Sequence, residues 1–144
     1  MVLGLVSPEE EKRIFEKLLE YYKKLYQEEG ITFKKQEKKL TKKEIGELYY
    51  TYPGEEELAT EQEKIRMINE AINHGYKTPV IIMQKSKKMI LLDGHRRVHV
   101  AWKQGSAWDA LLIIPNKNMD FGIEKMILGK VKDLLLYRKF DNLQ

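Results

Sequence analysis

Apolar residues recur at three- and four-residue spacing between Ile14 and Tyr26, which predicts one long amphipathic helix near the start of the chain. Ser7 is a typical N-cap residue, and Pro8 suits the first helical position. Gly30 is expected to end the helix. The apolar face indicates that this helix packs on the rest of the fold, and its tyrosines leave a homodimer surface as the alternative.

Shorter apolar runs in the second half of the chain predict buried strands, because each run is too short for a helix. A polar turn separates the first two runs, so they are expected to form an antiparallel hairpin. A capping box at Thr60 and a stop at Gly75 predict a helix before the hairpin, and Gly105 ends another helix after it. The strands are expected at residues 79–83, 89–92 and 110–114, and the second helix at 95–104.

Three other stretches carry weaker patterns. Residues 31–40 are charged and are expected to form an exposed connection with a brief strand at 31–33. A capping box at Thr41 predicts a short helix, and the aromatic run after it predicts a strand over 48–52. Residues 120–139 have helical spacing, with Gly129 as a break between two pieces.

The order of these elements predicts an α+β fold with a small mixed sheet and helices. A long N-terminal helix precedes the sheet region, and C-terminal helices follow it. We divide the chain into an N-terminal helical extension (1–45), a sheet-containing domain (46–115) and a C-terminal helical element packed on the same domain (116–144).

Composition narrows the classes of protein to which the chain can belong. The sequence is 42% hydrophobic, enough for a core, and its lack of cysteine excludes disulfides, thiolate metal sites and cysteine nucleophiles. No apolar run reaches the roughly 18 residues of a membrane span, and no signal-peptide pattern begins the chain. We therefore expect a soluble, cytoplasmic protein with no membrane partner. The net charge of +4 is modest for a nucleic-acid binder.

A predicted strand, a glycine turn and a helix start meet in the sequence DGHRR, from Asp93 to Arg97. His95, Arg96 and Arg97 occupy the first turn of the helix, where the dipole already favours anions. Basic side chains placed there need a negatively charged partner, and a phosphate is the obvious one. Asp93 is a candidate either to accept a substrate proton or to hold a nucleotide-bound Mg²⁺.

The ordered run PVIIM…MILLDGHRRVHVAWKQG…ALLIIP resembles the domain shared by ParB partition proteins and sulfiredoxins. Members of that family place a helix, an apolar strand after a proline, a hairpin and a basic glycine turn before a helix that ends in glycine. The resemblance covers residues 46–115. It implies a ParB/sulfiredoxin-like fold in which Gly94, His95, Arg96 and Arg97 hold nucleotide phosphates.

The branches of this family narrow the chemistry further. Sulfiredoxins need a cysteine where this chain has Gly94, so sulfinic acid reduction is excluded. ParB-type proteins bind CTP and continue into a helix-turn-helix domain, for which the residues after Pro115 are too few. The free-serine-kinase branch has Asp-Gly-His-His-Arg at the turn, the pattern closest to this one. That branch implies a functional glutamate, which aligns with Glu56.

Two classes of function follow. The first is a nucleotide-dependent phosphotransferase or NTPase that binds ATP, ADP or CTP with Mg²⁺ and acts on a small-molecule acceptor. Arg96 and Arg97 would clamp the phosphates, and Glu56 and Asp93 would be the catalytic carboxylates. The second is a ParB-related DNA-binding or partition-type module without catalysis. No protein-held metal is predicted, because His99 follows His95 at the spacing of a metal pair without an evident third ligand.

Overall fold

A computed structural model describes residues 5–52 and 58–134 of the chain, and it confirms the predicted α+β class. The helices are α1 (Pro8–Leu25), α2 (Lys42–Glu47), α3 (Leu58–Ile72), α4 (His95–Gln104) and α5 (Val131–Leu134), with a 3-10 helix η1 (Ile123–Met126). The strands are β1 (Phe33–Leu40), β2 (Tyr49–Tyr50), β3 (Val80–Lys85), β4 (Lys88–Asp93), β5 (Trp108–Pro115) and β6 (Gly129–Lys130).

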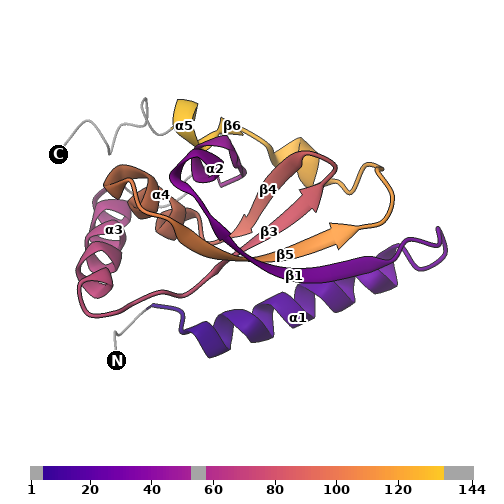
Figure 1. The fold of residues 1–144 in the computed structure, drawn as a ribbon, viewed down its shortest axis with the longest axis horizontal. Coiled ribbons are helices and arrows are strands. Elements are labelled where there is room, and N and C mark those ends of the chain that lie inside the picture. Colours follow the sequence, from indigo (N-terminus) through magenta and orange to yellow (C-terminus); the bar gives the residue numbers. More distant parts are fainter. Residues whose placement is uncertain (1–4, 53–57, 135–144) are drawn as a thin grey trace.

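The six strands form one mixed sheet in the order β1-β5-β3-β4-β2-β6 (Figure 1). β1 and β5, β3 and β4, and β2 and β6 are antiparallel pairs, whereas β5 with β3 and β4 with β2 are parallel. The predicted hairpin is therefore confirmed as β3 and β4, joined at Ser86-Lys87.

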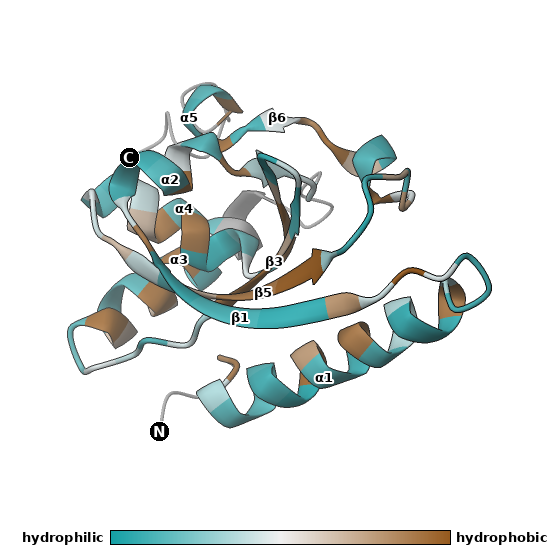
Figure 2. Ribbon diagram, turned by 45° about the vertical axis from the view of Figure 1, so that its right-hand side comes forward, coloured by the Kyte–Doolittle hydropathy of each residue, from teal (hydrophilic) through white to brown (hydrophobic). Residues whose placement is uncertain are grey.

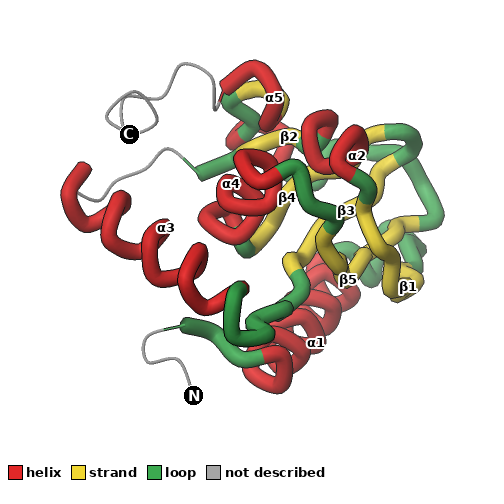
Figure 3. The backbone as a smooth tube through the Cα atoms, turned by 60° about the vertical axis from the view of Figure 1, so that its left-hand side comes forward, coloured by secondary structure: helices red, strands yellow, loops and turns green. Residues whose placement is uncertain are grey.

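Helices cover both faces of this sheet. α1 lies along one face under β1 and β5, with its hydrophobic residues toward the strands (Figure 2). α2 and α4 lie on the opposite face, and α3 packs against the outer side of α4 (Figure 3). The central strand β3 is therefore buried on both sides, which explains its unbroken apolar run. Val80 and Ile82 join the core under α4, and Ile81 and Met83 join the core over α1.

Two predictions near the N-terminus were wrong in extent. α1 ends at Leu25 rather than at Gly30, and a series of turns separates the two positions. The connection predicted over residues 31–40 is instead the eight-residue strand β1, which pairs along its whole length with β5. β1 is the first strand in the sheet order, and its exposed charged residues are typical of an edge strand. Such a strand lacks the alternating apolar pattern that would predict it.

Two helix predictions also need correction. α3 begins at Leu58, before the capping box expected at Thr60. The helix predicted over residues 120–139 is replaced, in its described part, by η1, β6 and α5, while residues 135–139 lie outside the described residues. Gly129 breaks this segment as predicted, with φ +150°, and pairs with β2.

The described parts of the three predicted segments contribute to one sheet. β1 comes from residues 1–45, β6 comes from 116–144, and both join strands of 46–115. Leu40 and Val131 accordingly pack in the same core cluster as Val80. Across residues 5–52 and 58–134, no helix combines the length and apolar character needed to cross a membrane.

Candidate functional site

The predicted glycine turn lies between β4 and α4. Gly94 is the N-cap of α4 and has φ +100°, in the left-handed region that glycine tolerates. A Cβ atom at this position would lie 2.5 Å from Cγ1 of Val80, so the turn also touches the start of β3 closely. Gly94 has no side chain with which to cap the helix, and the N–H groups of the first turn of an α-helix point out of its end rather than to acceptors within it.

This turn opens onto a cavity of about 520 Å³. One wall is formed by Asp93, Gly94, His95, Arg96 and Arg97. The other walls come from Leu5 and Val6 before α1, from Tyr52 after β2, from Tyr76, and from Lys64, Met67 and Ile68 of α3. Five of the six predicted site residues therefore line one cavity, and the sixth, Glu56, lies outside the described residues.

His95 is oriented by a short hydrogen-bond relay. The hydroxyl of Thr51 donates to the carbonyl oxygen of Leu91 at 2.8 Å, and its oxygen lies 2.8 Å from Nε2 of His95. Because the hydroxyl proton is used by Leu91, Nε2 must be the donor in this contact. The rings of Tyr50 and Tyr52 lie 4.9 and 5.6 Å from the imidazole and fix its plane.

Arg96 and Arg97 take different positions although they are neighbours. The guanidinium of Arg96 lies over the ring of Tyr52 at 5.4 Å, and its Nη2 atom is 3.3 Å from the Tyr52 hydroxyl. Stacking of this kind holds a guanidinium flat at a cavity wall. Arg97 is only 5% exposed, and its Nη1 atom donates to the carbonyl oxygen of Pro79 at 2.6 Å. Arg96 is thus the arginine placed to meet a ligand, and Arg97 is embedded behind it.

Arg97 also forms a buried hydrogen bond with a carboxyl in the first turn of α1. Its Nη2 atom lies 2.7 Å from Oε2 of Glu11 and 3.5 Å from Oδ2 of Asp93. Glu11 is fully buried, and burial is the main reason that its pKa rises to about 8. The nearby Asp93 carboxyl raises the pKa further, and Arg97 opposes the shift. A carboxyl from the N-terminal helix is therefore part of the candidate site.

The N-terminal segment is fixed to the cavity by further hydrogen bonds. The carbonyl oxygen of Val6 accepts from the hydroxyls of Tyr76 and Thr78, at 3.0 and 2.8 Å. Sequence reasoning missed Glu11, Thr51 and this segment as site components. Glu11 has the expected pattern of an acid in the first turn of a helix, and only its spacing of four residues before Phe15 and eight before Leu19, which places it on the apolar face, separates it from Glu9 and Glu10.

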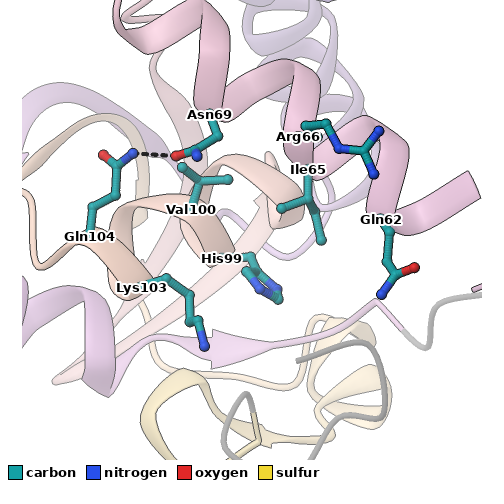
Figure 4. Close-up of a pocket in the computed structure, with 8 residues that line it drawn as sticks. All are labelled: Gln62, Ile65, Arg66, Asn69, His99, Val100, Lys103 and Gln104. Atoms are coloured by element: carbon teal, nitrogen blue, oxygen red, sulfur yellow. Dashed lines mark hydrogen bonds between the residues drawn. The ribbon is translucent and has the colours of Figure 1, made fainter. Parts of the chain in front are cut away.

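His99 does not share the cavity of His95. It faces a second cavity, of about 610 Å³, between α3 and α4 (Figure 4). Polar side chains of both helices line that cavity, and Gln104 on α4 donates a hydrogen bond to Asn69 on α3. The spacing of the two histidines along the helix therefore does not bring them together at one site.

Comparisons with protein-family models, with curated proteins and with solved structures found no match to this chain.

Proposed function

We propose that this chain binds the phosphate groups of a nucleotide in the cavity at the N-terminus of α4. The observation that carries the proposal is that Asp93 to Arg97, the residues of the basic glycine turn, line one cavity. The first-turn N–H groups and the helix dipole favour an anion there, and the stacked guanidinium of Arg96 adds a charged donor. The resemblance of this turn to that of ParB and sulfiredoxin-like proteins supports the same ligand class.

The cavity also has room and walls for the rest of a nucleotide. Its volume of about 520 Å³ lies within the range of small-molecule sites. Tyr52 and the apolar side chains Met67 and Ile68 offer surfaces on which a base or ribose can pack. The phosphates would then lie toward Arg96 and the base toward α3.

We further propose that the protein is a phosphotransferase or NTPase with a small-molecule acceptor. Asp93 is the one carboxylate among the described lining residues of this cavity. Because Arg97 lies 3.5 Å from it, we assign Asp93 to the acceptor hydroxyl rather than to a metal. Mg²⁺ would arrive bound to the phosphates of ATP, ADP or CTP. Glu56 stays the candidate second carboxylate from the resemblance.

Calorimetric titration of ATP, ADP and CTP with Mg²⁺ tests the phosphate site. Arg96→Ala removes a charge-assisted contact worth about 1.5–3 kcal/mol, so we expect affinity to fall by roughly 10- to 100-fold. Arg13→Ala is the matched control, because Arg13 is an exposed arginine of α1 outside the cavity. If no nucleotide gives heat, or if both variants bind as the wild type does, the proposal is wrong.

Phosphate release and transfer assays test the catalytic part. Asp93→Asn and Glu56→Gln should each lower turnover, and a fully active double variant would rule out the assigned roles. Binding of DNA with a steep salt dependence and without nucleotide turnover would favour the ParB-related module instead.

A further inference from the structure

Two carboxyl groups approach the same guanidinium nitrogen beside the cavity. Nη2 of Arg97 lies 2.7 Å from Oε2 of Glu11 and 3.5 Å from Oδ2 of Asp93. The side chain of Asp93 is 39% exposed and reaches the cavity wall, whereas Glu11 is 0% exposed. The cluster therefore connects the buried end of α1 with the open side of the site.

The charges of this cluster do not balance if both carboxyls are ionised. Two carboxylates around one guanidinium would leave a net negative charge where Glu11 has no contact with water. Among the described residues, Tyr76 also interacts electrostatically with Glu11; it is a half-buried phenol whose hydroxyl donates to Val6 and whose pKa is raised by burial, so it adds no positive charge. A single proton shared by the two carboxyls restores neutrality.

The hydrogen bonding of Glu11 is consistent with such a proton. Oε2 accepts from Arg97, but no described group donates to Oε1. The neighbouring carboxyl of Asp93 becomes a partner of Glu11 when one of the two carries a proton, and this contact and burial both raise the pKa of Glu11. The more buried carboxyl of the two is the one that desolvation keeps neutral.

We propose that Glu11 is a positioning residue of the site, which holds Arg97 in place and stays protonated. Asp93 is therefore the single ionised carboxyl at the cavity wall. Asp93 is then available to accept a hydrogen bond or a proton from a ligand. A divalent cation between the two carboxyls is disfavoured, because the guanidinium of Arg97 already occupies the space facing both. The role of α1 in this fold thus includes a direct contribution to the site. The role of Asp93 toward a ligand rests on the proposed function.

Carboxyl titration by nuclear magnetic resonance, on the full chain with labelled glutamate and aspartate side chains and without nucleotide, tests the shared proton. We expect one glutamate to titrate between about pH 7 and 9, to be absent in Glu11→Gln, and to persist in Glu20→Gln. Glu20 is the matched control, because it is an exposed glutamate of the same helix. Titration of Glu11 near its ordinary value would overturn the proposal, as would a shift of both carboxyls on adding Mg²⁺ alone.

The pH profile of nucleotide affinity tests the effect on the cavity. Ionisation of Glu11 adds a negative charge behind Asp93, so wild-type affinity should fall by roughly tenfold between pH 7 and pH 9.5. Glu11→Gln keeps the size of the side chain and should flatten this part of the profile, whereas Glu20→Gln should not. Parallel profiles for wild type and Glu11→Gln would overturn the proposal. If no nucleotide binds at any pH, the proposed function fails, and the carboxyl titration alone decides the role of Glu11.

Discussion

The Nη2 atom of Arg97, in the first turn of α4, lies 2.7 Å from the Oε2 atom of Glu11, in the first turn of α1. The two residues are 86 positions apart in the chain, and both side chains are buried. Their contact crosses from the helix on one face of the sheet to the basic glycine turn. Because Arg97 also donates to Pro79 before β3, it joins three separate parts of the chain at the candidate site.

Removing Arg97 should destabilise the fold strongly. Arg97→Ala leaves the carboxyl of Glu11 and the carbonyl of Pro79 buried without their donor, and each buried polar group left unsatisfied costs about 1–3 kcal/mol. Arg97→Lys should recover only part of the loss, since an ammonium lacks the planar fork that reaches several acceptors. Urea unfolding followed by circular dichroism measures both, with Arg13→Ala as the exposed control, expected within about 0.5 kcal/mol of wild type. An equal effect of Arg13→Ala and Arg97→Ala would contradict this account.

The free energy of unfolding should depend on pH because Glu11 ionises at a different pH in the folded and unfolded chain. Its pKa rises from 4.5 to about 8 in the folded chain, so the folded state binds more protons than the unfolded state between those values. The stabilisation is complete below pH 4.5 and is lost as pH rises through 8, with a slope of at most about 1.4 kcal/mol per pH unit. Glu47 makes stability depend on pH in the opposite direction. Hydrogen bonds from Lys130 and Lys132 lower its pKa to about 2, so its contribution to stability is lost only as the pH falls below 4.5.

Urea unfolding at intervals between pH 5 and pH 8.5 measures this slope. We expect the free energy of unfolding to fall with pH in the wild type and in Glu20→Gln, and to fall less steeply in Glu11→Gln. Other groups titrate in this window, so the comparison of the three proteins isolates the contribution of Glu11. A slope in Glu11→Gln as steep as that of the wild type would show that this carboxyl is not the source.

Features set by neighbouring residues could be predicted from the sequence. The hairpin of β3 and β4, the turn at Gly94 and the stop at Gly105 each follow from a few adjacent residues, and the structure confirms all three. The strand β1 could not be predicted, because its polar residues are held extended by pairing along their whole length with β5, a distant part of the chain. The segment after Asp120 was mistaken for a helix because its apolar spacing is helical, whereas Gly122 and Gly129 adopt positive φ angles that interrupt it.

Only the part of the candidate site that is built from consecutive residues could be predicted from the sequence. Asp93 to Arg97 are consecutive, so their convergence on one cavity follows from the turn. Glu11 and Thr51 reach the same site through the packing of α1 and through the parallel pairing of β2 with β4. Contacts between residues so far apart depend on the sheet order, which no local pattern in this sequence fixes.

The relay from Thr51 to His95 should set the protonation of the imidazole. Because the Thr51 hydroxyl donates to Leu91, we expect Nε2 of His95 to carry a proton, which nitrogen chemical shifts of the imidazole report directly. Thr51→Val keeps the shape but removes the acceptor, so the tautomer signal should change and stability should fall by about 1–2 kcal/mol. Thr32→Val, at an exposed threonine, is the control. An unprotonated Nε2 in the wild type would contradict the relay.

Gly94 should be sensitive to substitution for a steric reason beyond its backbone angle. Gly94→Ala and Gly75→Ala both place a side chain at positive φ, at +100° and +89°, which costs about 1 kcal/mol or more. The new Cβ at Gly75 meets nothing within 4 Å, whereas at Gly94 it would lie 2.5 Å from Cγ1 of Val80. We therefore expect Gly94→Ala to lose about 1–3 kcal/mol more than Gly75→Ala in urea unfolding.

A double-mutant cycle with Val80→Ala identifies the cause. Val80→Ala alone should destabilise the core, because Val80 is fully buried, but it removes the Cγ1 atom at 2.5 Å and keeps only the Cβ atom, which would lie 2.9 Å from the new Cβ. The combined variant should consequently be more stable than the sum of the two single losses predicts, by at least about 0.5 kcal/mol. Additive losses would instead show that the contact with Cγ1 of Val80 is not the source of the extra loss of Gly94→Ala.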